Sequence, residues 1–202
     1  MVYIVGLGPG HRDYILPAAI KIMEESDVIL GFKRALETLD FIDNKKEVRN
    51  SLQDILKYIK ENQHKTIALV ASGDPNFYGI TDYINRNYQE DIEVIPGISS
   101  YQYLMGKLNK SWQQAYLSSV HGREEAFITK VKEYEKSIWL TDKERNPKVL
   151  CTLLVVSNIN CEVAIGENLS YEDEKISVGH PKDLMNNEYS NLSVVFINKK
   201  TE

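Results

Sequence analysis

The chain has 202 residues, of which 43% are hydrophobic and 26% charged, which is typical of a globular protein with one large or two small domains. Its formal net charge of −5 argues against a broad nucleic-acid-binding surface. The apolar stretches are far shorter than the roughly 20 residues that span a bilayer, and no basic segment precedes the first of them. We therefore expect a cytoplasmic protein that binds neither nucleic acid nor membranes.

Short apolar runs alternate with helical patterns through the first half of the chain. Strands are expected over Val2–Leu7, Asp27–Gly31, Thr66–Ala71 and Ile92–Ile95, and helices over Tyr14–Glu25, Ser51–Asn62, Asn76–Asn87 and Ser99–Lys107. Ser51 with Asp54 three residues later is typical of a helix N-cap. Repeated strand–helix units with short connections predict an α/β fold with a parallel, doubly wound sheet.

The second half has a different order of elements. The polar stretch Asn109–Gln114 sets the expected domain boundary near residue 110, which gives domains of residues 1–110 and 111–202. Strands are expected over Ala115–Ser119, Ser137–Thr141, Glu162–Gly166, Ile176–Val178 and Ser193–Asn198, and helices over Arg123–Lys136, Pro147–Val156 and Pro181–Asn186. Because the last strands have little helix between them, we expect a mixed sheet.

The two cysteines, Cys151 and Cys161, lie in an expected helix and near the strand that follows it. The sequence has no Cys-x-x-Cys pair and no cluster of histidines and cysteines, and its four histidines are not spaced as metal ligands. We therefore expect two buried free thiols and no protein-bound metal.

Three strand-to-glycine turns occur in the first half, each followed by a helical pattern: Gly6–Gly10, Gly73–Gly79 and Pro96–Ser100. They predict one ligand cleft along the carboxyl edge of the sheet. The first turn resembles a dinucleotide fingerprint, but His11 stands where a third glycine is required and Pro9 lacks an amide proton. These departures disfavour an NAD-dependent oxidoreductase.

The same turns also have ordinary structural explanations. Asp before Pro is a common turn starter, so Asp74 can simply accept hydrogen bonds from backbone amides. Ser99 or Ser100 can cap the next helix, and the free amides at a helix start also suit a ligand carboxylate. Phe77 and Tyr78 fit a hydrophobic core as well as a ligand site.

Basic residues gather near the expected strand ends, at His11, Arg12, Lys33, Arg34, His121 and Arg123. They fit an ordinary solvated surface, and they also fit a cationic rim for a polyanionic substrate on an otherwise acidic protein. His121 and Arg123 follow an expected strand at a strand-to-helix corner, where function concentrates in such sheets. A surface or capping role for His121 stays open.

The three turns, in this order, resemble those of the tetrapyrrole methylase family. Its Gly-x-Gly-Pro-Gly turn is matched by Gly6–Gly10, its Gly-Asp-Pro turn with a following aromatic residue and glycine by Gly73–Gly79, and its Pro-Gly-x-Ser/Thr turn by Pro96–Ser99. One such turn is a weak signal, whereas three in register are specific. The resemblance covers nearly the whole chain.

Three further stretches are similar to the branch of this family that methylates C-5 of cobalt-precorrin-7, a step of cobalamin biosynthesis. They are Asp13–Ala19, Ser119–Arg123 with its Ser-x-His-Gly-Arg pattern, and Gly166–Glu174. Leu16 and Glu172 depart from that branch, in which threonine and proline are usual at these positions.

The resemblance implies two αβα domains with S-adenosylmethionine in the cleft between them, in a homodimer that acts on a corrinoid. The implied donor contacts are Pro9, Gly73, Asp74, Pro75, Phe77, Tyr78, Ser99 and Ser100 from the first half and Leu117, Ser118 and Gly166 from the second. The implied substrate contacts are His11, Arg12 and Arg123, with His121 as the best candidate for a general base. Asp74 is expected to organise the donor turn.

Other functions stay open beside this one. A member of the same family could act on another corrinoid position or on an acceptor that is not a tetrapyrrole. A non-catalytic nucleotide-binding module would prefer ATP or NAD to S-adenosylmethionine. Because the sequence ends at Glu202 without a second methyltransferase domain, C-15 methylation and decarboxylation are expected of a separate partner protein.

Overall fold

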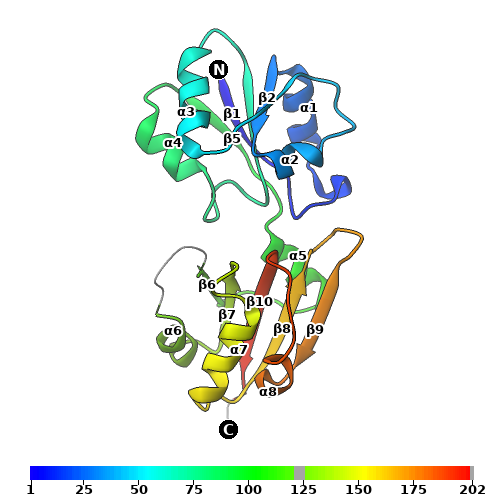
Figure 1. The fold of residues 1–202 in the computed structure, drawn as a ribbon, viewed down its shortest axis with the longest axis vertical. Helices are drawn as coiled ribbons and strands as arrows, with labels where there is room; N and C mark the ends of the chain where they lie inside the picture. Colours follow the sequence, from blue (N-terminus) through cyan, green and yellow to red (C-terminus); the bar gives the residue numbers. More distant parts are fainter. Residues whose placement is uncertain (121–125, 201–202) are drawn as a thin grey trace. The chain divides into compact units, whose positions relative to one another are not determined.

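The computed structural model describes residues 1–120 and 126–200. The chain divides into two compact units, Met1–Ser99 and Ser100–Glu202, each built on one β-sheet (Figure 1). The helix that begins at Ser100 belongs to the second unit, whereas the sequence had set the boundary near residue 110. Within the part of the chain that the structure describes, no helix is both long and apolar enough to cross a membrane.

The first unit holds a five-stranded sheet in which all neighbouring strands are parallel, in the order β3-β2-β4-β1-β5. Its strands are β1 (Val2–Gly6), β2 (Val28–Gly31), β3 (Lys46–Val48), β4 (Ile67–Ala71) and β5 (Ile92–Ile95). The structure confirms the predicted parallel sheet and the predicted strands β1, β2, β4 and β5. Because the strands are parallel, their carboxyl ends, and the turns that follow them, share one edge.

Helices cover both faces of this sheet, as Figure 1 shows. They are α1 (Pro17–Glu25), α2 (Lys33–Glu37), α3 (Leu52–Glu61) and α4 (Thr81–Asn87), and a short 3-10 helix without buried residues, η1 (Arg12–Tyr14), precedes α1. Neighbouring residues of a strand point to opposite faces, so Val5 packs in a core with α1 and α2 while Ile4 packs in another with α3 and α4. The first unit is therefore a three-layer αβα sandwich.

Helix ends explain where prediction and structure differ. The Ser51 hydroxyl accepts a hydrogen bond from the Asp54 amide at 3.1 Å, which confirms the predicted N-cap of α3. The helix expected from Tyr14 begins at Pro17, because a proline suits the first helical position and a 3-10 turn precedes it. The helix expected from Asn76 begins at Thr81, since the residues before it form a tight turn.

The second unit holds a mixed sheet in the order β6-β7-β10-β8-β9, in which β6 and β7 are parallel and the other neighbours antiparallel. Its strands are β6 (Tyr116–Ser119), β7 (Lys136–Leu140), β8 (Cys161–Glu167), β9 (Lys175–Gly179) and β10 (Ser193–Lys199). The mixed sheet was predicted from the short connections between the last strands, which suit antiparallel pairs.

The helices of the second unit are α5 (Ser100–Lys107), α6 (Phe127–Glu133), α7 (Pro147–Val156) and α8 (Pro181–Leu184). Helices α6, α7 and α8 share a buried core with Trp139 and Val195, while α5 contacts β10. Cys151 on α7 and Cys161 on β8 are buried free thiols, as predicted. Burial raises the pKa of Cys151 to about 12 and that of Cys161 to about 11, which keeps both thiols protonated and unreactive.

Candidate functional site

The three glycine turns of the first unit meet at the carboxyl edge of its sheet, beyond β1, β4 and β5. The Leu7 amide donates to the Ala71 carbonyl at 2.9 Å. One residue further, the Gly8 amide donates to the Gly73 carbonyl at 3.2 Å and the Gly73 amide donates to the Gly8 carbonyl at 2.7 Å. The Leu7 bond extends the parallel pairing of β1 and β4, and the two bonds between Gly8 and Gly73 form an antiparallel bridge that joins the first two turns.

The third turn is packed against the first two through glycine backbones. A Cβ atom on Gly97 would lie 2.1 Å from the Gly73 carbonyl oxygen, and one on Gly6 would lie 2.5 Å from the Gly97 nitrogen. No side chain fits at either position, so the sequence must place glycine there. We call this assembly of Gly6, Gly8, Gly73 and Gly97 the glycine junction.

Two glycines of the junction adopt the left-handed backbone conformation, Gly8 with φ +74° and Gly73 with φ +68°. They differ in the space around them. A Cβ on Gly8 would lie 2.7 Å from the Tyr14 carbonyl oxygen, whereas beside Gly73 the nearest atom is the Ser99 Cα at 4.0 Å. Gly73 therefore combines a special conformation with an open side, which is where a ligand can approach the backbone closely.

The Gly-Asp-Pro turn is held by its own hydrogen bonds. The Asp74 carboxylate accepts from the Asn76 amide at 2.7 Å, and the Asp74 carbonyl accepts from the Phe77 amide at 3.1 Å. A Cβ on Gly79 would lie 2.3 Å from the Pro75 carbonyl oxygen, so the far side of the turn is also closed by glycine. Asp74 thus forms the Asx turn that the sequence allowed, and it organises this segment.

The two aromatic residues of this turn have different environments. The Phe77 and Tyr78 rings meet edge to face, with centroids 5.0 Å apart. Tyr78 has a φ of +51°, which is rare for a bulky residue, and it is 42% exposed. Exposure rules out the core role for Tyr78, and unusual backbone conformations of this kind concentrate at functional sites.

The candidate residues of the second unit fall into two separate groups. Leu117 and Ser118 lie on β6, and Gly166 lies on β8, with β7 and β10 between these strands. Three strand spacings separate the groups by about 14 Å. A Cβ on Gly166 would lie 2.7 Å from a Leu169 methyl group, so packing alone already requires glycine at this position.

The structure describes only some of the predicted cationic residues of the site. His11 and Arg12 lie at the start of η1, at the same sheet edge as the glycine junction. The His11 Nδ1 atom accepts from the Asp13 amide at 3.3 Å, and the Arg12 guanidinium stands 5.6 Å from the centre of the Phe41 ring. His121 and Arg123 lie outside the described residues, so their predicted roles stay predictions.

The stretch Gly166–Glu174 has a structural role that its sequence alone does not indicate. It connects β8 to β9, and the Glu174 carboxylate accepts from the Ser170 amide at 2.7 Å and pairs with Lys107 of α5 at 3.0 Å. Burial alone would raise the pKa of Glu174, but these partners and the Tyr103 hydroxyl outweigh burial and lower it. The motif therefore ties the β8–β9 connection to α5.

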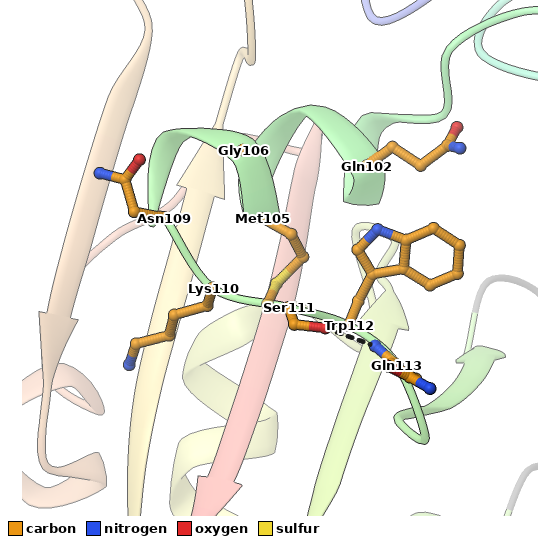
Figure 2. Close-up of a pocket in the computed structure, with 8 residues that line it drawn as sticks. All are labelled: Gln102, Met105, Gly106, Asn109, Lys110, Ser111, Trp112 and Gln113. Atoms are coloured by element: carbon orange, nitrogen blue, oxygen red, sulfur yellow. Dashed lines mark hydrogen bonds between the residues drawn. The ribbon is translucent and has the colours of Figure 1, made fainter.

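A pocket of about 610 Å³ lies between α5 and the segment that follows it (Figure 2). Its lining residues are Gln102, Met105, Gly106, Asn109, Lys110, Ser111, Trp112 and Gln113. The Trp112 ring is 41% exposed and packs edge to face against Tyr101 at 5.5 Å. None of the predicted site residues lines this pocket, and the sequence predicts a domain boundary in the segment that follows α5.

Among residues 1–120 and 126–200, no group of three His, Cys, Asp or Glu side chains could hold a metal ion.

A parallel sheet whose carboxyl-edge turns carry a glycine junction, followed by a unit with a mixed sheet, defines a two-unit α/β protein, and the carboxyl edge is where such sheets usually bind ligands. Comparison with known proteins identifies the family. The profile of the tetrapyrrole (corrin/porphyrin) methylases matches residues 1–184, and the chain belongs to this family.

Relatives with assigned names are similar over nearly their whole length. A probable cobalt-precorrin-7 C(5)-methyltransferase of Methanocaldococcus jannaschii is 40% identical, over 96% of this chain and 96% of the relative. The cobalt-precorrin-7 C(5)-methyltransferase of Salmonella typhimurium is 30% identical, over 99% of this chain and all of the relative. The crystal structure of a cobalamin biosynthesis precorrin-6Y methylase from Archaeoglobus fulgidus has a TM-score of 0.79 and 25% identity, over 100% of this chain and 98% of the other.

Proposed function

We propose that this chain transfers a methyl group from S-adenosylmethionine to C-5 of cobalt-precorrin-7. The observation that carries the proposal is the 40% identity to a probable cobalt-precorrin-7 C(5)-methyltransferase over 96% of both chains. The Ser119–Arg123 and Gly166–Glu174 patterns favour the same acceptor position over other positions on a corrinoid. The chain therefore belongs to cobalamin biosynthesis in this proposal.

The glycine junction is the proposed donor site in the first unit. Gly73 offers an open backbone in the left-handed conformation, and the exposed Tyr78 ring lies in the same turn. S-adenosylmethionine supplies a methyl group on a sulfonium that needs no further activation. The protein then has to bind and orient the donor and exclude water, and Asp74 does this indirectly by fixing the turn. The further proposed contacts are Pro9, Pro75, Phe77, Ser99, Ser100, Leu117, Ser118 and Gly166.

The proposed acceptor is a corrinoid that carries several carboxylates. Arg12 at the same sheet edge is mostly exposed and is 3.9 Å from Asp13, a weak pair that leaves its guanidinium available to a substrate carboxylate. His11 lies beside it. Arg123 and His121 complete the proposal, with His121 as the candidate general base. A homodimer is also part of the proposal, by family resemblance.

Donor binding is tested first, and methyl transfer second. Calorimetric titration is expected to show saturable binding of S-adenosylmethionine and none of ATP or NAD at the same concentrations. Incubation with methyl-labelled donor and cobalt-precorrin-7 is then expected to move the label to the corrinoid. Preference for ATP or NAD would contradict the proposal in favour of a nucleotide-binding module, and donor binding without transfer to this acceptor would contradict the assigned substrate.

A further inference from the structure

The segment Phe32–Arg34 borders the glycine junction on the same sheet edge. It follows β2 directly and forms the start of α2. Leu30 pairs with Leu69, so Phe32 lies at the level of Ala71, which in turn pairs with Gly6 of β1. With β4 between them, the ends of β2 and β1 are about 10 Å apart, roughly the width of one flat macrocycle edge.

This segment breaks the local rules for starting a helix. Phe32 is the N-cap residue and makes no side-chain capping bond, although serine, threonine, aspartate and asparagine are the residues preferred at this position. Lys33 and Arg34 are the first two residues of this five-residue helix, and no acidic residue accompanies them in its first turn. A helix start without a capping side chain is a candidate functional segment, because the local rules are most often broken at functional sites.

The side chains of Phe32, Lys33 and Arg34 are all exposed to solvent. Phe32 is 39% exposed, an apolar ring that the first unit leaves open to solvent. Lys33 is paired with Glu37 at 3.7 Å, whereas Arg34 forms no ion pair or hydrogen bond with the residues that the structure describes. Val48, which pairs with Gly31 at the end of β2, is 45% exposed as well. The edge therefore presents apolar surface beside an available guanidinium.

We infer that Phe32, Lys33 and Arg34, here the α2 patch, bind the acceptor, with Phe32 against the apolar macrocycle and Arg34 and Lys33 on its carboxylates. The corrinoid class of the ligand rests on the proposed function. Acceptor recognition then extends from Arg12 across the edge to the end of β2. A ring with charged peripheral groups matches an apolar face flanked by cations.

Two stable corrinoids separate the two contributions. Dicyanocobyrinic acid carries free carboxylates, whereas in dicyanocobinamide they are amidated, so the ring is kept and the charge is removed. We expect Arg34→Gln and Lys33→Gln each to weaken binding of dicyanocobyrinic acid about two- to fivefold, since exposed pairs contribute up to about 1 kcal/mol. Neither change should alter binding of dicyanocobinamide. Phe32→Ala should weaken binding of both corrinoids about fivefold, because it removes a contact with the shared ring.

Lys57→Gln is the matched control. Lys57 on α3 forms the same kind of pair with Glu61, at 3.9 Å, and is 74% exposed compared with 78% for Lys33. It lies on α3, outside the α2 patch, and should leave both affinities unchanged. Circular dichroism and calorimetric affinity for S-adenosylmethionine verify that each variant is folded and retains its donor site.

Different results would contradict acceptor binding by the α2 patch and methyl transfer to cobalt-precorrin-7. If the wild-type protein methylates cobalt-precorrin-7 but the three variants bind dicyanocobyrinic acid as tightly as wild type, the α2 patch is not part of the acceptor site. The same conclusion follows if the wild-type protein does not bind dicyanocobyrinic acid, or if Lys57→Gln weakens binding as much as Lys33→Gln. Failure of wild-type methyl transfer, with the donor bound, contradicts the proposed function instead.

Discussion

Gly8 and Gly73 exchange two main-chain hydrogen bonds, of 3.2 and 2.7 Å, across the gap between the turns that follow β1 and β4. The exchange holds two turns that are distant in sequence in one rigid position, and Gly97 completes the assembly from the turn after β5. Because all of these contacts are between backbones, the position of the Gly-Asp-Pro turn depends on the absence of side chains at the junction.

Gly97→Ala tests the junction. The new methyl group would lie 2.1 Å from the Gly73 carbonyl, a backbone atom that cannot rotate away, so we expect unfolding free energy to fall by about 3 kcal/mol. Donor affinity should fall with it. Gly106→Ala is the control, because a Cβ atom added to this residue of α5 would meet nothing within 4 Å and alanine favours helices by about 0.5–1 kcal/mol. Urea unfolding of both variants checks this, and equal stabilities would contradict the close packing.

Asp74 distinguishes turn formation from direct charge contact with the donor. Asp74→Ala removes the acceptor for the Asn76 amide and should weaken donor binding at least tenfold, the equivalent of about 1.4 kcal/mol. Asp74→Asn keeps an oxygen acceptor, so donor affinity should stay within about threefold of wild type. Calorimetry with S-adenosylmethionine measures both. Normal affinity in the alanine variant would show that the turn does not organise the donor site.

The buried thiols predict an alkaline loss of stability. Their pKa values are raised from 9.0 to about 12 and about 11, so above pH 9 the unfolded chain releases protons that the folded chain retains. Stability is therefore fully present below pH 9 and falls between pH 9 and 11, by about 1.4 kcal/mol per pH unit for each thiol. Urea unfolding of Cys151→Ala should show a shallower decline over that range. Parallel slopes in wild type and variant would contradict the burial of Cys151.

Glu174 predicts an acid-dependent contribution from the β8–β9 connection. Its pKa is lowered from 4.5, so its stabilisation is present above pH 4.5 and is lost as the pH falls through the lower, folded-state value. Glu174→Gln should reduce unfolding free energy by about 1 kcal/mol at pH 7, and the difference from wild type should vanish in strong acid. Glu172→Gln, an exposed neighbour, should change stability by less than about 0.5 kcal/mol. A pH-independent difference would contradict the ion pair with Lys107.

Local signals in the sequence predicted most of the fold. Ser51 and Pro147 marked helix starts because capping and the missing proline amide act within one turn. The elements α2 and β3 were missed because five and three residues are too short for a hydrophobic period to be visible. The start of α4 was set too early because the hydrogen bond from the Asn76 amide to Asp74 uses residues that otherwise suit a helix.

Only part of the candidate site could be predicted from the sequence. Glycine turns after parallel strands share an edge, so one cleft along that edge could be expected, whereas the contact of Gly8, Gly73 and Gly97 depends on the strand order β4-β1-β5, which the sequence did not predict. The role of Glu174 could not be expected, because it depends on contact with Lys107, a residue distant in sequence. The openness beside Gly73 and the exposure of Tyr78 are likewise properties of the packed chain.

The most direct test of the proposed function is the position of the transferred methyl group. The protein is incubated with S-adenosylmethionine labelled with carbon-13 in its methyl group and with cobalt-precorrin-7, and the product is examined by NMR. The proposal predicts a single labelled methyl group on C-5. A labelled methyl group on any other carbon, or no labelled product when calorimetry shows the donor bound, would contradict it.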